Sequence, residues 1–174
     1  MKSLCMLAGF VVLGACTVPV VTIDGAIPFS QVMAETADLP YECSAYDART
    51  DSCRGYSTHE PQGDGRFLAT STVRLAEEVP AIEATYSVVE TGNVVCSINS
   101  TLELRFAREV GLSEELRLAE FESAFKAQED TCFIYTRTEN GYRSQVVRGP
   151  EEALADPISD YQFFNAPKRL RVRG

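Results

Sequence analysis

Apolar and polar residues alternate along three consecutive stretches in the middle of the chain. In residues 67–75 and 82–88 every second residue is mostly apolar, and the same holds for the even-numbered residues of the longer stretch 96–106. A period of two residues is typical of a strand with one buried face. The pattern therefore predicts three strands of one sheet, connected in sequence.

The register between the second and third strands depends on the length of their turn. A two-residue turn at Gly92-Asn93 would set Val89 opposite Cys96 and would bring polar residues onto the apolar face of the third strand. A three-residue loop over residues 91–93 pairs Val88 with Cys96 instead. Directly opposed residues share a face of the sheet, so the apolar pattern favours the three-residue loop.

A helical period follows the third strand. Ser113 suits the N-cap, two glutamates suit the positive end of a helix, and Leu118, Phe121 and Phe125 recur at helical spacing. We predict one amphipathic helix over residues 113–128, with both phenylalanines buried against the even-numbered face of the third strand.

The regions on either side are less regular. Asn140-Gly141 between two alternating stretches predicts a hairpin, and residues 150–155 predict a helical turn. Residues 41–66 have no clear period and predict an irregular loop. Residues 16–40 predict a tether containing a short helix from Ser30 to about residue 37.

The predicted organisation is one domain over residues 41–174. Its fold class is α+β: a twisted antiparallel sheet of about five strands with one amphipathic helix packed across one face. An apolar share of 45% is normal for a chain that buries a core.

The first residues have the composition of a secretory signal. Lys2 is followed by an apolar run from Leu4 to Val12 and then by Leu13-Gly14-Ala15-Cys16, which is too short a run for a transmembrane helix. The last four residues resemble the lipobox of bacterial lipoproteins. The resemblance implies that residues 1–15 are removed and that Cys16 carries a diacylglycerol thioether as a membrane anchor.

Two further points concern this leader. By analogy with Gram-negative lipoproteins, Thr17 rather than Asp after the cysteine implies the outer membrane, with the protein facing the periplasm. The alternative is an ordinary small-residue cleavage site, at which Cys16 would be incidental.

The remaining cysteines predict two disulfides. Apart from Cys5 in the leader and the candidate lipid site, the chain has Cys43, Cys53, Cys96 and Cys132. An even number in an oxidising compartment indicates disulfides. Cys43 and Cys53 bracket a short turn-rich segment and are expected to pair, which leaves Cys96 with Cys132. A zinc site would need a two-residue ligand spacing that these cysteines lack.

The charge is strongly acidic, with 25 acidic and 16 basic residues and a net charge of −9. This balance argues against nucleic-acid binding and against electrostatic adsorption on anionic lipid. The contrast is a basic tail at Lys168, Arg169, Arg171 and Arg173. Such a tail can contact lipid phosphates, acidic glycans or an acidic partner, or it can be a solubilising end or an edge strand over residues 169–173.

Candidate catalytic and metal-binding residues lie in the predicted loop. The only histidine, His59, has the neighbours Ser57, Glu60 and Asp64. A hydrolase needs a histidine between a nucleophile and an orienting acid, and sequence proximity in a loop does not provide that geometry, so a solvated histidine is expected. Three acids flank the first disulfide: Glu42, Asp47 and Asp51. They lack the ligand order of an EF-hand, and no metal or cofactor is predicted.

The sequence therefore favours a non-enzymatic envelope lipoprotein with a binding or structural role in the periplasm. Its expected partners are the membrane, through the lipid, and a protein or other envelope component. The alternative is a lipid-anchored periplasmic hydrolase with a site assembled from scattered residues. A pocket in which His59 lies at hydrogen-bond distance from a serine or an aspartate would favour the hydrolase.

Overall fold

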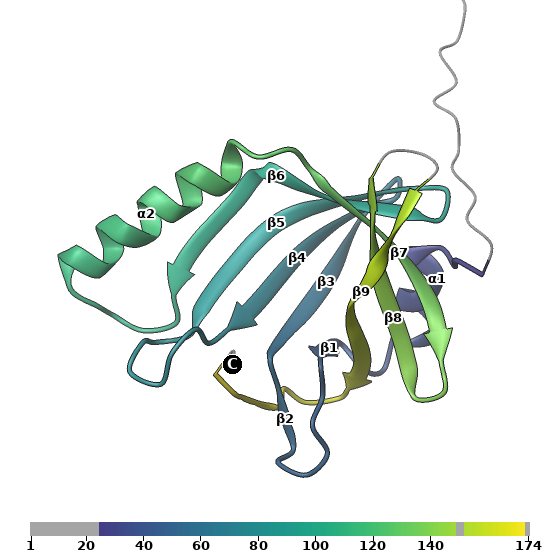
Figure 1. The fold of residues 1–174 in the computed structure, drawn as a ribbon, viewed down its shortest axis with the longest axis horizontal. Coiled ribbons are helices and arrows are strands. Elements are labelled where there is room, and N and C mark those ends of the chain that lie inside the picture. Colours follow the sequence, from purple (N-terminus) through teal and green to yellow (C-terminus); the bar gives the residue numbers. More distant parts are fainter. Residues whose placement is uncertain (1–24, 149–151, 173–174) are drawn as a thin grey trace, which may run out of the picture.

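The described part of the chain folds into a closed antiparallel barrel of eight strands, accompanied by two helices and a small two-stranded sheet (Figure 1). The computed structural model describes residues 25–148 and 152–172. The elements in chain order are α1 (Phe29–Glu35), β1 (Tyr41–Ser44), β2 (Ser52–Cys53), β3 (Gly55–Gly63), β4 (Arg66–Val73), β5 (Ile82–Thr91), β6 (Val94–Phe106), α2 (Leu112–Lys126), β7 (Thr131–Thr138), β8 (Gly141–Arg148), β9 (Glu152–Phe164) and β10 (Arg169–Leu170).

The barrel strands follow one another around the wall in chain order, from β1 through β3 to β9. Closure comes from β9, which pairs antiparallel with β1 over Tyr41–Ser44. The predicted α+β sheet of about five strands is therefore wrong: the fold is mostly β, and the sheet has no face that one helix spans. β2 and β10 pair in parallel and form the small second sheet.

The sequence-based prediction missed several strands, among them β3, which has polar residues on its inner side. The sequence predicts an irregular loop over residues 41–66, but β1, β2 and β3 occupy most of it. In β3, Ser57 and His59 lie on the same side of the strand and both line a cavity inside the barrel, so the apolar half of the alternating pattern is absent. The start of β9 is also missed: the strand begins at Glu152, where a helical turn is predicted over residues 150–155.

The central strands, the last hairpin and both disulfides agree with the sequence-based prediction. β4, β5 and β6 form the expected meander, and β7 and β8 form the expected hairpin. Cys43 is bonded to Cys53, which joins β1 to β2. Cys96 is bonded to Cys132, and these two cysteines lie directly opposite each other in the β6–β7 ladder.

The turn between β5 and β6 has two residues, not the predicted three. Thr91 pairs with Val94, and Val89 pairs with Cys96. A bulge in β6 makes this register compatible with the apolar pattern. Ser87 pairs with Ile98, and the next pair of the ladder is Thr85 with Glu103, so residues 99–102 of β6 are left out of the pairing. The bulge changes which residues are buried: odd-numbered Val95 is buried in the core before the bulge, and even-numbered Leu102 is buried at its end. The even-numbered apolar residues therefore do not form one continuous face.

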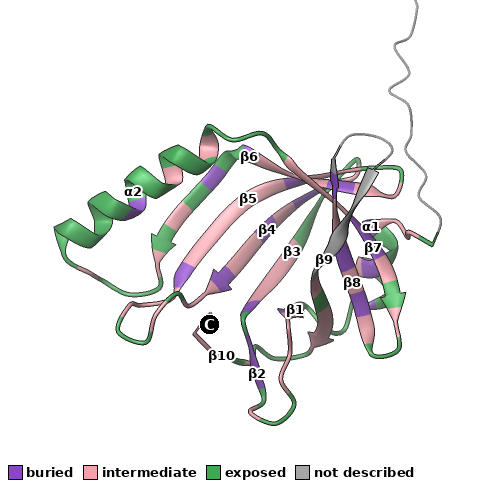
Figure 2. Cartoon of the chain, in the orientation of Figure 1, coloured by how far each residue is buried: buried purple, intermediate pink, exposed green. Residues whose placement is uncertain are grey.

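α1 closes one end of the barrel, within the stretch predicted to be a tether. Phe29 is 2% exposed and Val32 is fully buried, and both belong to the main hydrophobic cluster. Glu35 holds the helix to the β7–β8 hairpin by accepting a hydrogen bond from the hydroxyl of Tyr142 at 2.7 Å. Figure 2 shows buried residues at this end of the barrel and also along β2, β4, β5 and β6.

α2 lies beside the far half of β6 rather than across a sheet face (Figure 1). Glu122 accepts a hydrogen bond from the backbone N–H of Leu104 at 2.7 Å, and Leu118 is the buried residue of the helix. The expected burial of the phenylalanines is wrong, since Phe121 is 52% and Phe125 is 36% exposed. Gly111 takes the N-cap position predicted for the serine two residues later.

Candidate functional site

A buried pair of ionisable side chains lies inside the barrel. Glu42 on β1 and His59 on β3 are 2.7 Å apart between Oε2 and Nε2, and their side chains are 3% and 6% exposed. The hydroxyl of Tyr135 donates a hydrogen bond to the other carboxylate oxygen of Glu42 at 3.1 Å. The expectation of a solvated loop histidine is therefore wrong. The pairing offsets part of the cost of removing both side chains from water, since Nδ1 of His59 is buried without a hydrogen-bond partner among the described residues.

Three tyrosines converge on this pair from different strands. Tyr86, Tyr135 and Tyr161 line the same small cavity as Glu42 and His59. Burial raises the pKa of each phenol, and the negative charge of Glu42 raises the pKa of all three further. In a site this dry, the neutral phenol is strongly favoured over the phenolate.

The cavity itself is small, with a volume of about 80 Å³. Pockets for small organic ligands measure roughly 300–1,000 Å³, so this one has room only for water-sized molecules. An eight-stranded barrel is typically just wide enough for its side chains to fill, and aromatic residues such as Phe29 fill this one. The ring of Phe29 contacts that of His59 edge-on at 4.9 Å between centroids.

The residues proposed as catalytic partners of His59 do not meet it. The hydroxyl of Ser57 lies 2.7 Å from that of Ser71 and forms its hydrogen bond there. Glu60 is exposed on the same strand, and Asp64 lies in the turn after β3. The partner of His59 is Glu42, whose importance could not be inferred from the irregular spacing around it.

The three acids near the first disulfide separate in space. Glu42 points into the barrel, whereas Asp47 accepts hydrogen bonds from Thr50 within its own turn, and Asp51 pairs with Lys168. Within residues 25–148 and 152–172, no group of three potential metal-ligating His, Cys, Asp or Glu side chains is found.

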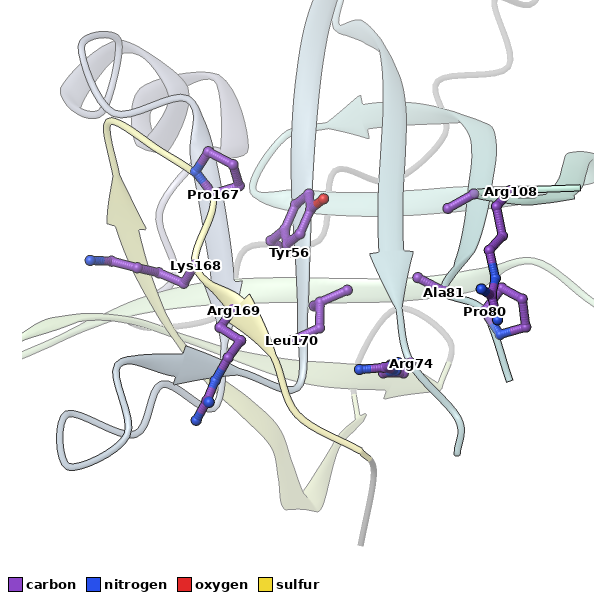
Figure 3. A pocket seen from close by; sticks show the side chains of 10 residues that line it. Tyr56, Arg74, Pro80, Ala81, Arg108, Pro167, Lys168, Arg169 and Leu170 are labelled. Carbon is purple, nitrogen blue, oxygen red and sulfur yellow. The ribbon is translucent and has the colours of Figure 1, made fainter. Parts of the chain in front are cut away.

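A second candidate site is an open groove on the surface, with a volume of about 590 Å³ (Figure 3). We call it the basic groove. It lies between the C-terminal segment and the ends of β4 and β6, and its lining residues are Tyr56, Arg74, Pro80, Ala81, Ala107, Arg108, Pro167, Lys168, Arg169 and Leu170. Four of these residues are basic and none is acidic, although the chain as a whole carries a charge of −9.

The basic residues of the groove differ in how far they are already paired. Lys168 is neutralised by Asp51 at 2.9 Å, and it lowers the pKa of that carboxyl group mainly through a hydrogen bond. Arg74 donates a hydrogen bond to the carbonyl of Glu77 at 3.1 Å. The side chains of Arg108 and Arg169 form no hydrogen bond or ion pair within the part of the chain that the structure describes, although the charge of Arg169 helps to lower the pKa of Asp51. The groove therefore has an excess of positive charge.

The basic tail predicts only part of this groove. Lys168 and Arg169 line it, Arg171 donates a hydrogen bond to the carbonyl of Ala45 nearby, and Arg173 lies outside the described residues. The sequence-based prediction missed two further arginines of the groove. Arg74 directly follows β4, and Arg108 lies two residues after the end of β6. Alternate strands of an antiparallel barrel run in the same direction, so their ends meet at one rim, and only the strand order makes this visible.

The chain matches no known protein family, and neither characterised proteins nor solved structures show a significant similarity to it. The leader and Cys16 lie outside the described residues. Neither helix in the described part is both long enough and apolar enough to cross a membrane.

Proposed function

We propose that this protein is a non-enzymatic binding protein of the bacterial cell envelope, tethered by lipid on Cys16, and that it binds an anionic ligand in the basic groove. The observation that carries the proposal is the contrast between the two sites. The barrel interior is nearly filled, with a cavity of about 80 Å³, whereas the groove is more open and measures about 590 Å³.

The interior argues against the alternative of a hydrolase. His59 is bound to a glutamate rather than to a serine or an aspartate, and the cavity that both residues line is too small for a substrate and a nucleophile together. A buried His–Glu pair with a tyrosine on its carboxylate is well explained as a structural polar network.

The chemistry of the groove favours a carboxylate or phosphate group. The guanidinium groups of Arg108 and Arg169 are unpaired, and a planar guanidinium binds such anions through two parallel hydrogen bonds. The long polyanionic backbone of a nucleic acid is disfavoured, because the rest of this acidic surface would repel it.

Charge reversal in the groove tests the proposal, with tripolyphosphate as the probe. The double variant Arg108→Glu/Arg169→Glu should bind tripolyphosphate at least about tenfold more weakly than the wild type by calorimetry, since two charge-assisted contacts are lost. The control Arg66→Glu/Arg117→Glu changes two exposed arginines outside the groove and alters the net charge equally. If the control variant loses as much affinity, or the wild type does not bind, the proposed site is wrong.

The tether is tested separately. Protein extracted from membranes should carry the mass of a diacylglycerol thioether on Cys16 at its N-terminus. Cys16→Ser should leave the protein unlipidated and shift it into the soluble fraction. A membrane-extracted wild type without added mass would remove the anchor from the proposal, whereas the binding site would be unaffected.

A further inference from the structure

β10 has a free edge on the groove side. It pairs in parallel with β2 on its other side, through Arg169 with Ser52 and Leu170 with Cys53. The backbone N–H of Arg171 donates to the carbonyl of Cys53 at 2.9 Å. Successive residues of a strand direct their backbone N–H and C=O groups to opposite sides. The backbone groups of Arg169 and Arg171 therefore point toward β2, and those of Leu170 point away from it.

The backbone of Leu170 therefore presents an unpaired donor and an unpaired acceptor. Among the described residues, neither its N–H nor its C=O has a hydrogen-bond partner outside the β2–β10 ladder. Leu170 lines the basic groove together with Tyr56 and Arg74. Figure 3 shows these two side chains on the side of β10 opposite to β2. An open strand edge of this kind can pair with one more strand.

The fold protects a comparable edge elsewhere. On the side away from β5, the far half of β6 pairs with no strand among the described residues. There Asp130 accepts a hydrogen bond from the N–H of Asn99 at 2.8 Å, and Glu122 accepts one from the N–H of Leu104 at 2.7 Å. These carboxylates block strand addition at β6. The edge of β10 has arginines around it instead, which would attract an acidic strand rather than block it.

We propose that the ligand of the basic groove is an acidic polypeptide segment in extended conformation, which adds to β10 as a further strand. Its backbone pairs with the N–H and C=O of Leu170, and its carboxylates bind the guanidinium groups of Arg108 and Arg169. This inference rests on the proposed function and specifies its ligand. A peptide is favoured over other anions because its backbone alone supplies both hydrogen-bonding groups at strand spacing.

A pair of probe peptides with equal charge tests the proposal. Hexaglutamate should bind the wild type, whereas hexaglutamate with every backbone nitrogen methylated should bind about tenfold more weakly, because it has lost its backbone donors. In the wild-type protein, bound hexaglutamate should slow the hydrogen exchange of the Leu170 amide, as measured by NMR. Tripolyphosphate should bind without slowing that exchange.

The outcomes separate the two proposals. If both peptides bind equally and the Leu170 amide stays unprotected, strand addition is wrong and the anion site stands. If hexaglutamate binding survives Arg108→Glu/Arg169→Glu, the peptide does not use the groove, and this inference fails. If the wild type binds neither tripolyphosphate nor hexaglutamate, the proposed function fails as well.

Discussion

His59 and Glu42 are the residues on which the barrel interior depends most. Both side chains are almost completely buried, and each is the hydrogen-bonding partner of the other. Removing one partner of a buried pair leaves the other without compensation in a dry environment, and this costs more than the pair itself contributes.

We predict that His59→Ala lowers the free energy of unfolding by about 3–5 kcal/mol, because Glu42 would remain buried without its partner. The matched control is Glu60→Ala, the next residue of β3, which is exposed and should change the stability by less than about 0.5 kcal/mol. Urea unfolding of both variants at neutral pH measures the difference. Equal stabilities would mean that the pair is not buried as described.

At the scale of elements, α2 is attached through one leucine rather than through its aromatic residues. Leu118 is 9% exposed, while Phe121 and Phe125 contact each other at 5.1 Å between ring centroids on a largely exposed flank. Helical spacing alone places Leu118, Phe121 and Phe125 on one apolar face of the helix. Because the helix lies along the edge of β6 rather than across a sheet, only a narrow part of that face is covered.

The second stability prediction follows from this placement. Leu118→Ala should cost about 2–3 kcal/mol, as expected for truncation of a buried leucine at the margin of a core. Phe125→Ala should cost less than about 1.5 kcal/mol, because its side chain keeps 36% of its surface exposed. Thermal or urea unfolding decides between them, and a larger loss for the phenylalanine variant would place that ring in the core.

The elements also differ in how far they could be predicted. β4, β5 and the β7–β8 hairpin have apolar inner faces or a strong turn signal, so local patterns are sufficient for them. β3 could not be predicted because its inner residues Ser57 and His59 are polar, and their burial depends on partners from β1 and β4. Likewise, the bulge in β6 cannot be read from alternation, which continues through it unchanged.

At the scale of the whole molecule, closure of the barrel could not be predicted from the sequence. The β1–β9 pairing joins residues more than a hundred positions apart, and no local pattern specifies it. The same closure determines the candidate site: the tail residues Lys168 and Arg169 stand out by composition, whereas Arg74 and Arg108 become part of the groove only through the order of the strands.

Closure also gathers three tyrosines, and this makes the stability of the barrel sensitive to alkali. Tyr86, Tyr135 and Tyr161 come from β5, β7 and β9, and the pKa of each is raised above the usual value of a phenol, first by burial and further by the charge of Glu42. In the unfolded chain the phenols ionise near pH 10, while in the folded chain they stay protonated to higher pH. The unfolded state therefore loses protons first, so the stability is fully present below pH 10 and falls as the pH rises further.

Urea unfolding at pH 8, 10 and 11 should show little change over the first step and a clear loss over the second, because all three pKa values are raised in the folded state. Tyr161→Phe keeps the ring but removes one ionising group, so its loss between pH 10 and 11 should be smaller than that of the wild type. A wild-type stability that is flat up to pH 11 would mean that the three phenols ionise as easily in the folded protein as in water, and that the barrel does not enclose them.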